Sequence, residues 1–178
     1  MPGLGARPAS FGTLVHLILE QQVSLASAQA VFDRLRQRLG PGLRPQDFLQ
    51  LDREELQGLG FSRQKVTYGQ ALAQALAGGD LDLDELDRAS DDEVRRQLTA
   101  LPGIGPWTAD VYLLMVLRRP DVWPAGDLAL ARGLQHHHRL ATRPAPDETT
   151  RLAAPWRPWR SVAARLIWSD YLDRQATR

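Results

Sequence analysis

Apolar residues recur at intervals of three and four along most of the chain, and few stretches alternate apolar with polar residues. The first such run covers 11–19, and Ser10 before it is a residue typical of a helix N-cap. A second run extends from Ser24, another N-cap type, to Gly40, which is typical of the position after a helix. This periodicity predicts amphipathic helices without a sheet, so we expect an all-α protein.

Further helix starts are indicated by cap residues that precede apolar runs. They are Ser62 and two pairs with capping-box spacing, Asp52 with Glu55 and Ser90 with Glu93. We expect the last two helices near 126–140 and 158–173, with Pro158 in the first turn of the second one.

Two segments share a pattern of leucine, two residues, leucine and then a glycine turn: LQGLGFSRQKV (56–66) and LTALPGIGPWTA (98–109). Each predicts a helix-hairpin-helix. In the second, Gly103 and Gly105 can adopt positive φ, and Pro106 suits the start of the next helix. Backbone N–H groups of such a turn, reinforced by the helix dipole, can bind an anion such as a nucleic-acid phosphate. The alternative is a tight packing turn, because glycines also let helices approach closely.

Composition narrows the function classes. The 178 residues suffice for one large domain or two small lobes, and the absence of cysteine excludes disulfides, thiolate zinc sites and cysteine-ligated iron-sulfur clusters. The opening MPGLGARPAS lacks the features of a signal peptide, and no run of about 18 apolar residues offers a membrane span. We therefore expect a cytoplasmic protein that does not contact membranes.

The net charge of +1 conceals an uneven distribution. Residues 80–93 carry −7, which leaves +8 on the rest, and of the 22 basic residues only Lys65 is lysine. Arginine suits bidentate phosphate contacts, although genomic base bias can also enrich it. We interpret the acidic stretch as a solvated linker or helix-capping segment.

A family resemblance follows from three motifs in order. LPGIGPWTAD (101–110) followed by PAGDLAL (124–130) resembles the helix-hairpin-helix-GPD superfamily of DNA base-excision glycosylases, and PWRPWRSVAARLIW (155–168) resembles the C-terminal helix of its alkylation-repair branch, the 3-methyladenine DNA glycosylase II type. The similarity extends from Phe11 to Tyr171. It implies one glycosylase unit over 1–178, with a hairpin near 98–117, two helical lobes with an active-site cleft between them, and no amino-terminal β-rich domain.

The candidate catalytic residue is Asp127, which lies 22 residues after Gly105, where the family has a carboxylate. Cleavage of an N-glycosidic bond builds positive charge on the sugar, and one carboxylate can stabilise it and orient a water. The alternative for Asp127 is an ordinary N-cap. Asp110 is a second candidate carboxylate; we expect it to be structural and count it among the residues of the substrate pocket.

Resemblance places Trp107, Trp168 and Tyr112 at the base pocket. Aromatic faces favour alkylated purines that carry positive charge, and the alternative is that the tryptophans form core. We assign Trp156 and Trp159 to packing.

Members that also nick DNA carry a lysine where this chain has Trp107, so the resemblance implies a monofunctional hydrolase that leaves an abasic site.

The expected partner of a monomeric enzyme is duplex DNA, from which the target nucleotide must be flipped. Resemblance places the residue that fills the gap at Gln22, with Gln21 or Val23 beside it, and further DNA contacts at Gly103, Ile104, Gly105 and Thr108.

The three histidines His136, His137 and His138 are consecutive and cannot converge on one metal ion. We expect no metal or other catalytic cofactor, although hairpin carbonyls of this family can bind a monovalent cation.

The sequence therefore predicts a glycosylase for 3-methyladenine or 7-methylguanine in duplex DNA. Two alternatives stay open: a noncatalytic protein that binds distorted or branched DNA through the same hairpin, and a glycosylase for another lesion. The preferred lesion depends on side-chain placement in the pocket.

Overall fold

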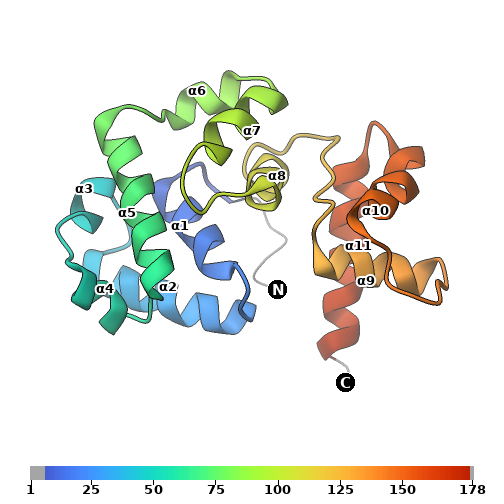
Figure 1. Ribbon diagram of the computed structural model, residues 1–178, viewed down its shortest axis with the longest axis horizontal. Helices are drawn as coiled ribbons and strands as arrows, with labels where there is room; N and C mark the ends of the chain where they lie inside the picture. Colours follow the sequence, from blue (N-terminus) through green and yellow to red (C-terminus); the bar gives the residue numbers. More distant parts are fainter. Residues whose placement is uncertain (1–6, 177–178) are drawn as a thin grey trace. The chain divides into compact units, whose positions relative to one another are not determined.

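The computed structural model describes residues 7–176, and regular secondary structure in this range is entirely helical (Figure 1). The all-α prediction is confirmed. The described residues form two compact units: an N-terminal unit from Pro8 to Thr108, and a C-terminal unit of Arg7 and the residues from Ala109 onward. Within 7–176, no helix has both the length and the apolar character needed to cross a bilayer.

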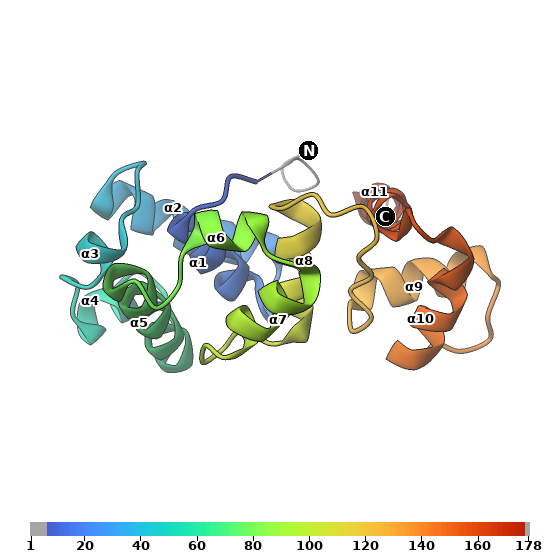
Figure 2. The same ribbon diagram turned by 90° about the horizontal axis from the view of Figure 1, so that it is seen from above.

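The N-terminal unit is built around α1 (Phe11–Glu20), which is apolar on nearly all sides and is buried accordingly. Helices α2 (Leu25–Leu39) and α5 (Arg63–Gly78) pack against it. The remaining helices of this unit are α3 (Pro45–Phe48), α4 (Arg53–Gly58), α6 (Leu83–Arg88) and α7 (Asp91–Thr99). Figures 1 and 2 show α3 and α4 at the opposite end of this unit from α7.

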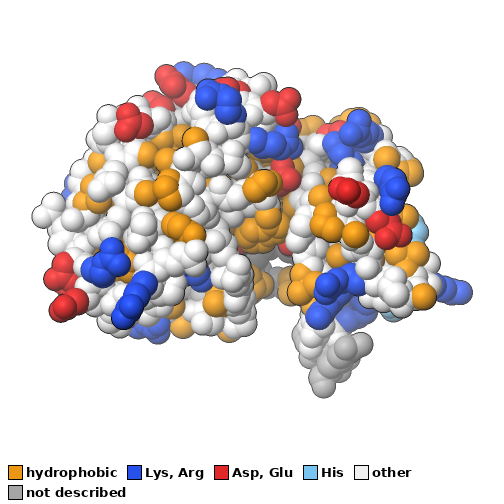
Figure 3. Space-filling view, in the orientation of Figure 1, with side chains coloured by type: hydrophobic (Ala, Val, Ile, Leu, Met, Phe, Trp, Pro, Cys, Tyr) orange, Lys and Arg blue, Asp and Glu red, His pale blue; other side chains and the backbone are white. Residues whose placement is uncertain are grey.

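The expected cap residues begin their helices as the sequence indicates. The side chains of four serines each accept a hydrogen bond from the backbone N–H three residues later, and Asp52 and Glu55 form the full capping box. The four serines are Ser10, Ser24, Ser62 and Ser90. The second expected box is only half formed, because the Glu93 carboxylate accepts from Arg96 and Gln97 while Ser90 caps the helix alone. The acidic stretch is helical for most of its length, with Asp82 as the N-cap of α6, and acidic side chains lie along the upper edge of this unit in Figure 3, where α6 and α7 run.

Both predicted hairpins are present. The first joins α4 to α5 with Gly60 at φ 103°, and the second joins α7 to α8 (Pro106–Met115) with Gly103 at φ 83°. Pro106 begins α8 as expected. Gly105 was expected to share the positive φ and does not, because a single left-handed residue suffices to turn the chain into α8.

The C-terminal unit contains most of α8, α9 (Leu128–His137), α10 (Pro146–Ala153), a short 3-10 helix (Ala154–Trp156) and α11 (Arg160–Ala176). Helices α9 and α11 pack closely at Gly133, where a Cβ would overlap the side chain of Ile167. The start of α11 is fixed by Arg160, whose Nε donates to Oδ1 of Asp121 at 2.6 Å.

Three sequence expectations fail in this unit. Helix α10 lies between the two expected helices; it lacks a side-chain cap that would have signalled its start. Helix α11 begins two residues after Pro158, because Asp121 accepts from the backbone N–H of Arg160 and so acts at its first turn. Trp159 is 61% exposed and does not pack in the core, whereas Trp156 does lie beside Trp123, with 5.8 Å between ring centroids.

Candidate functional site

The carboxylate of Asp127 is held at the N-terminus of α9 in the C-terminal unit. Its Oδ1 accepts from the backbone N–H of Leu130 at 2.8 Å, the bond that makes it the N-cap, and from the indole Nε1 of Trp168 at 3.0 Å. The side chain is buried, with 8% of its surface exposed. A buried carboxylate with two fixed donors has a defined orientation, which a group that stabilises developing positive charge requires.

Trp168 reaches Asp127 from α11, 41 residues further along the chain. The close approach of α9 and α11 at Gly133 makes this contact geometrically feasible. The sequence placed both residues in one pocket by resemblance, and the structure brings these two together. Their roles in a reaction stay predictions.

The other pocket candidates lie on α8 and have different environments. Tyr112 has no exposed surface and belongs to the core of the C-terminal unit, and Asp110 is half-buried. Trp107, also half-buried, is the second residue of α8 and belongs to the N-terminal unit. Because Tyr112 is fully buried, its position fits a core residue better than a residue that lines an open pocket. The assignment of all three residues to a base pocket stays a prediction.

In the second hairpin, Ile104 turns inward. Its side chain is 3% exposed, and its N–H donates to the carbonyl of Leu101 at 3.2 Å. The N–H of Ile104 is therefore not one of the turn's donors that could bind an anion, because the turn uses that donor itself. Gly105 and Pro106 are exposed at the start of α8, where the first N–H groups of a helix have no intrahelical acceptor. The predicted anion site of the hairpin would therefore use Gly105 and the first turn of α8.

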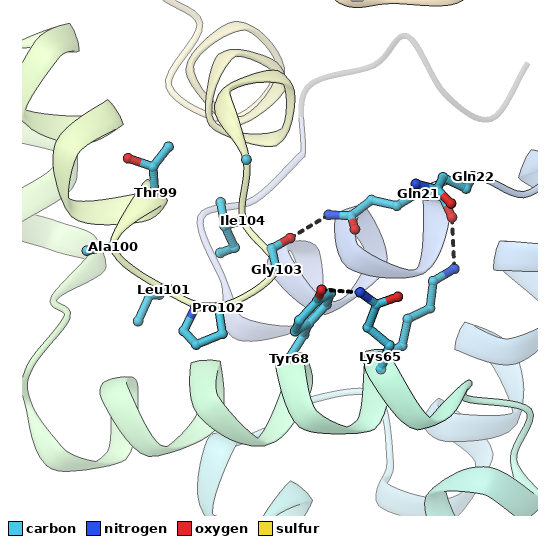
Figure 4. A pocket seen from close by; sticks show the side chains of 12 residues that line it. Gln21, Gln22, Lys65, Tyr68, Thr99, Ala100, Leu101, Pro102, Gly103 and Ile104 are labelled. Atoms are coloured by element: carbon cyan, nitrogen blue, oxygen red, sulfur yellow. Dashed lines mark hydrogen bonds between the residues drawn. The ribbon is translucent and has the colours of Figure 1, made fainter.

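Thr108 also turns inward, with 2% of its surface exposed. Its Oγ1 accepts from Nε2 of Gln21 at 3.0 Å, and the same amide nitrogen donates to the carbonyl of Gly103 at 2.8 Å (Figure 4). Gln21 was expected beside a DNA-inserting residue, and its side chain instead joins the end of α1 to the hairpin. Any DNA contact of Thr108 would therefore use its backbone.

The turn between α1 and α2, residues 21–23, exposes Gln22 and Val23. Gln22 has φ 57°, a left-handed conformation that is rare outside glycine. Lys65 of α5 supports this turn, because its Nζ donates to the carbonyls of Leu19 at 2.8 Å and Gln21 at 3.0 Å. Burial lowers the pKa of Lys65 from its usual value, while the two carbonyls provide partners for its charge.

A pocket of about 510 Å³ lies between this turn, α5 and the second hairpin, all within the N-terminal unit (Figure 4). Tyr68 forms part of its wall, and its ring packs so closely on Gly103 that a Cβ there would overlap it. Sequence reasoning missed this cluster of Gln21, Lys65 and Tyr68, because its contacts join residues far apart in the chain. The only available signal was that Lys65 is the sole lysine.

Within 7–176, no three His, Cys, Asp or Glu residues are grouped so that they could hold a metal ion. His136 and His137 end α9, and His138 is its C-cap. Nε2 of His137 lies 3.1 Å from Oδ2 of Asp170. Binding of a monovalent cation, which hairpins of this family can do, stays a prediction for this hairpin.

The chain matches the family model described as HhH-GPD superfamily base excision DNA repair protein over residues 15–158 and belongs to this superfamily. It is 30% identical over 158 residues to DNA-3-methyladenine glycosylase 1 of Schizosaccharomyces pombe, with 87% of this chain and 69% of that protein covered. It is 28% identical over 164 residues to DNA-3-methyladenine glycosylase 2 of Escherichia coli, with 86% of this chain and 55% of that protein covered.

Solved structures agree with this assignment. The S. pombe 3-methyladenine DNA glycosylase in complex with abasic DNA matches with a TM-score of 0.85 at 28% identity, covering 94% of this chain and 84% of that one. The resemblance to the alkylation-repair branch is therefore confirmed. The chain spans only 58% of the first relative, YfjP of Bacillus subtilis, to which it is 29% identical over 89% of its own length.

Proposed function

We propose that this protein is a monofunctional DNA glycosylase that hydrolyses the N-glycosidic bond of alkylated purines in duplex DNA and leaves an abasic site. The carrying observation is the carboxylate of Asp127, buried and oriented by the N–H groups of Leu130 and Trp168. The names of the relatives support the substrate class, 3-methyladenine and similar bases.

Asp127 would act on the sugar rather than on the base. As the bond to the base breaks, positive charge grows on the sugar, and a fixed carboxylate stabilises it better than mobile water does. The same group can orient or deprotonate a water that attacks the anomeric carbon. The departing purine already carries positive charge when alkylated, so it needs little help as a leaving group.

The environment of Lys65 supports hydrolysis without strand cleavage. A lyase step needs an amine that attacks the sugar, and the only lysine of the chain donates to the carbonyls of Leu19 and Gln21. The position after Pro106 is occupied by Trp107. We therefore expect strand breaks only after alkali treatment of the product.

The partner in this proposal is duplex DNA. A protein monomer would bind it through the exposed part of the second hairpin, at Gly105 and the start of α8. The complex of the S. pombe 3-methyladenine DNA glycosylase with abasic DNA supports this interaction. Because phosphate contacts release counterions, duplex affinity should fall as salt rises, with a log-log slope that reflects the number of phosphates neutralised. A flat salt response would contradict a DNA role.

The test of the function is release of free base from methylated duplex DNA, with 3-methyladenine resolved from 7-methylguanine. Asp127→Asn is the informative variant, because its amide oxygen can still cap α9 while the charge is removed. Release is expected to fall about 10²- to 10³-fold, as when one electrostatic stabiliser is lost, with the melting temperature nearly unchanged. Full activity in the variant would remove Asp127 from the mechanism.

A noncatalytic role in binding distorted or branched DNA is the second candidate, and one observation favours it. Asp127 already has a structural function as the cap of α9, so its presence alone does not require catalysis. No base release by the wild-type protein, together with intact duplex binding, would select this candidate or another lesion.

A further inference from the structure

Two segments that are expected to contact DNA are joined by one side chain in the N-terminal unit. The amide of Gln21 donates to the carbonyl of Gly103, 82 residues away, and to Oγ1 of Thr108, 87 residues away. Gln21 begins the turn that exposes Gln22, which we call the wedge turn (residues 21–23), and Gly103 lies in the second hairpin. Figure 4 shows the amide reaching across to the hairpin backbone.

Lys65 holds the wedge turn from the side of α5. Its two acceptors, the carbonyls of Leu19 and Gln21, lie at the end of α1, where helical carbonyls lack intrahelical donors and a cation interacts favourably with the helix dipole. Ordinary lysines remain exposed, whereas this one is half-buried. The left-handed backbone of Gln22 immediately follows these bonds, and such strain persists only where the surroundings fix it.

We propose that Gln21 and Lys65 are positioning residues that lock the wedge turn to the second hairpin, so that Gln22 is held in register with the hairpin that binds the DNA backbone. This rests on the proposed function and on Gln22 as the residue that fills the gap left by the flipped nucleotide. Neither positioning residue touches the base. Gln21, first expected to contact DNA, acts through Gln22 and the hairpin.

The physical benefit is preorganisation. Opening a base pair costs a few kcal/mol, and a turn that first had to become ordered would add its own conformational cost at the same step. A turn fixed by the four hydrogen bonds of Gln21 and Lys65 has met that cost on folding. The contribution should therefore be large where a base pair must be opened and small where the lesion is already unpaired.

The test compares single-turnover excision of 7-methylguanine paired with cytosine and of the same lesion opposite an abasic-site analogue. Gln21→Leu and Lys65→Met each remove the donors from one side of the turn and keep much of the side-chain volume. Each is expected to slow excision from the paired substrate about tenfold and to leave the unpaired substrate nearly unaffected. The control Gln64→Leu makes the same chemical change on a neighbouring side chain that bonds to Tyr68, and should leave both rates near wild type.

A double variant separates positioning from general damage. If Gln21 acts through Gln22, Gln21→Leu combined with Gln22→Ala should be no slower on the paired substrate than Gln22→Ala alone. Additive losses, or an equal loss on both substrates, would show a merely structural role and overturn the proposal. A paired-substrate rate for Gln22→Ala equal to wild type would overturn it as well.

Base unstacking gives a readout that does not depend on catalysis. Fluorescence of 2-aminopurine beside an abasic-site analogue should rise on binding of wild-type protein and rise less with Gln21→Leu or Lys65→Met. Because the two variants remove different sets of hydrogen bonds, either one that keeps the wild-type fold, checked by circular dichroism, suffices. A normal 2-aminopurine response in wild type without any base release would reject the glycosylase function alone, whereas equal responses in wild type and variants would reject the positioning role.

Discussion

The turn of the first hairpin is covered by α2, whereas the turn of the second is open at Gly105. In the first, a Cβ on Gly60 would lie 2.5 Å from Nη2 of Arg34 and 3.1 Å from Val31, and Arg34 donates to the carbonyl of Leu59. In the second, Gly103 is covered by Tyr68, but a Cβ on Gly105 would meet nothing within 4 Å. The same leucine-glycine pattern thus produces a packing turn in one place and an accessible backbone in the other.

The comparison shows what a glycine-turn motif does and does not specify. The motif specifies that the chain reverses through a left-handed residue between two helices. Which backbone groups remain accessible is decided by neighbours that come from elsewhere in the chain. An interpretation of a hairpin as a phosphate clamp therefore requires its surroundings as well as its glycines.

The largest effect is expected for Gly103→Ala. The alanine would have to adopt a left-handed backbone conformation, and its Cβ would overlap the ring of Tyr68. Together these two effects should lower the free energy of unfolding by about 2–4 kcal/mol. Denaturant unfolding measures the loss. If the ring is the obstacle, the loss in a double variant with Tyr68→Ala should be smaller than the sum of the two single losses. A loss no larger than that of Gly60→Ala would contradict the closer packing of Gly103.

A smaller loss is expected for Gly60→Ala, about 1–2 kcal/mol, although its φ is also positive. The closest neighbour is the end of the flexible Arg34 side chain, which can move away at the expense of its bond to Leu59. The same denaturant experiment applies. A loss as large as that of Gly103→Ala would show that Arg34 is rigidly held.

The third prediction concerns DNA rather than stability. A Cβ at Gly105 would meet no neighbour, and Gly105 has no positive φ, so the fold of Gly105→Val should be retained, while its side chain would block the approach of a phosphate to the start of α8. Duplex affinity should fall about tenfold at all sequences, with a shallower salt dependence. The control Gly42→Val also points into open space, away from either hairpin turn in sequence. Equal duplex affinities of the two variants would contradict phosphate binding at the second hairpin.

The smallest effect concerns the helix that leads into the second hairpin. A hydrogen bond from Arg96, aided by one from Gln97, lowers the pKa of Glu93 to about 2. Because this pKa is below the usual 4.5, the stabilisation is complete above that pH and is lost as the pH falls towards 2. Exposed ion pairs contribute little, so Glu93→Gln should lower the melting temperature only slightly at neutral pH and by less as the pH falls towards 2. A deficit that does not shrink as the pH is lowered would contradict the ion-pair explanation.

Local features of this molecule follow well from sequence. The serine caps, the capping box at Asp52 and the Pro106 start of α8 depend on residues three or four positions apart, and all are present. Helix α10 was missed because its N-cap is Ala145, which makes no side-chain hydrogen bond. Trp159 was misassigned because a large apolar residue beside a proline gives no indication of its exposure.

The contacts that give the candidate site its geometry could not be predicted from sequence. The bond of Trp168 to Asp127 joins residues 41 apart, and those of Gln21 reach 82 and 87 residues along the chain. Resemblance could place residues in one region but not specify which nitrogen donates to which oxygen. It placed Gln21 beside the DNA-inserting residue, which stays a prediction, and it gave no indication that the amide of Gln21 contacts the hairpin.

Asp127 both begins α9 and supplies the proposed reactive charge, and this has an evolutionary consequence. A descendant that lost its activity would still be under selection to keep an acceptor at this position, because replacement by alanine costs a helix about 1 kcal/mol. Inactive lineages could therefore keep aspartate for long periods or drift to asparagine, serine or threonine. Among homologues, retention of this aspartate marks a helix start, and loss of the charge to a neutral cap is the more informative sign of lost activity.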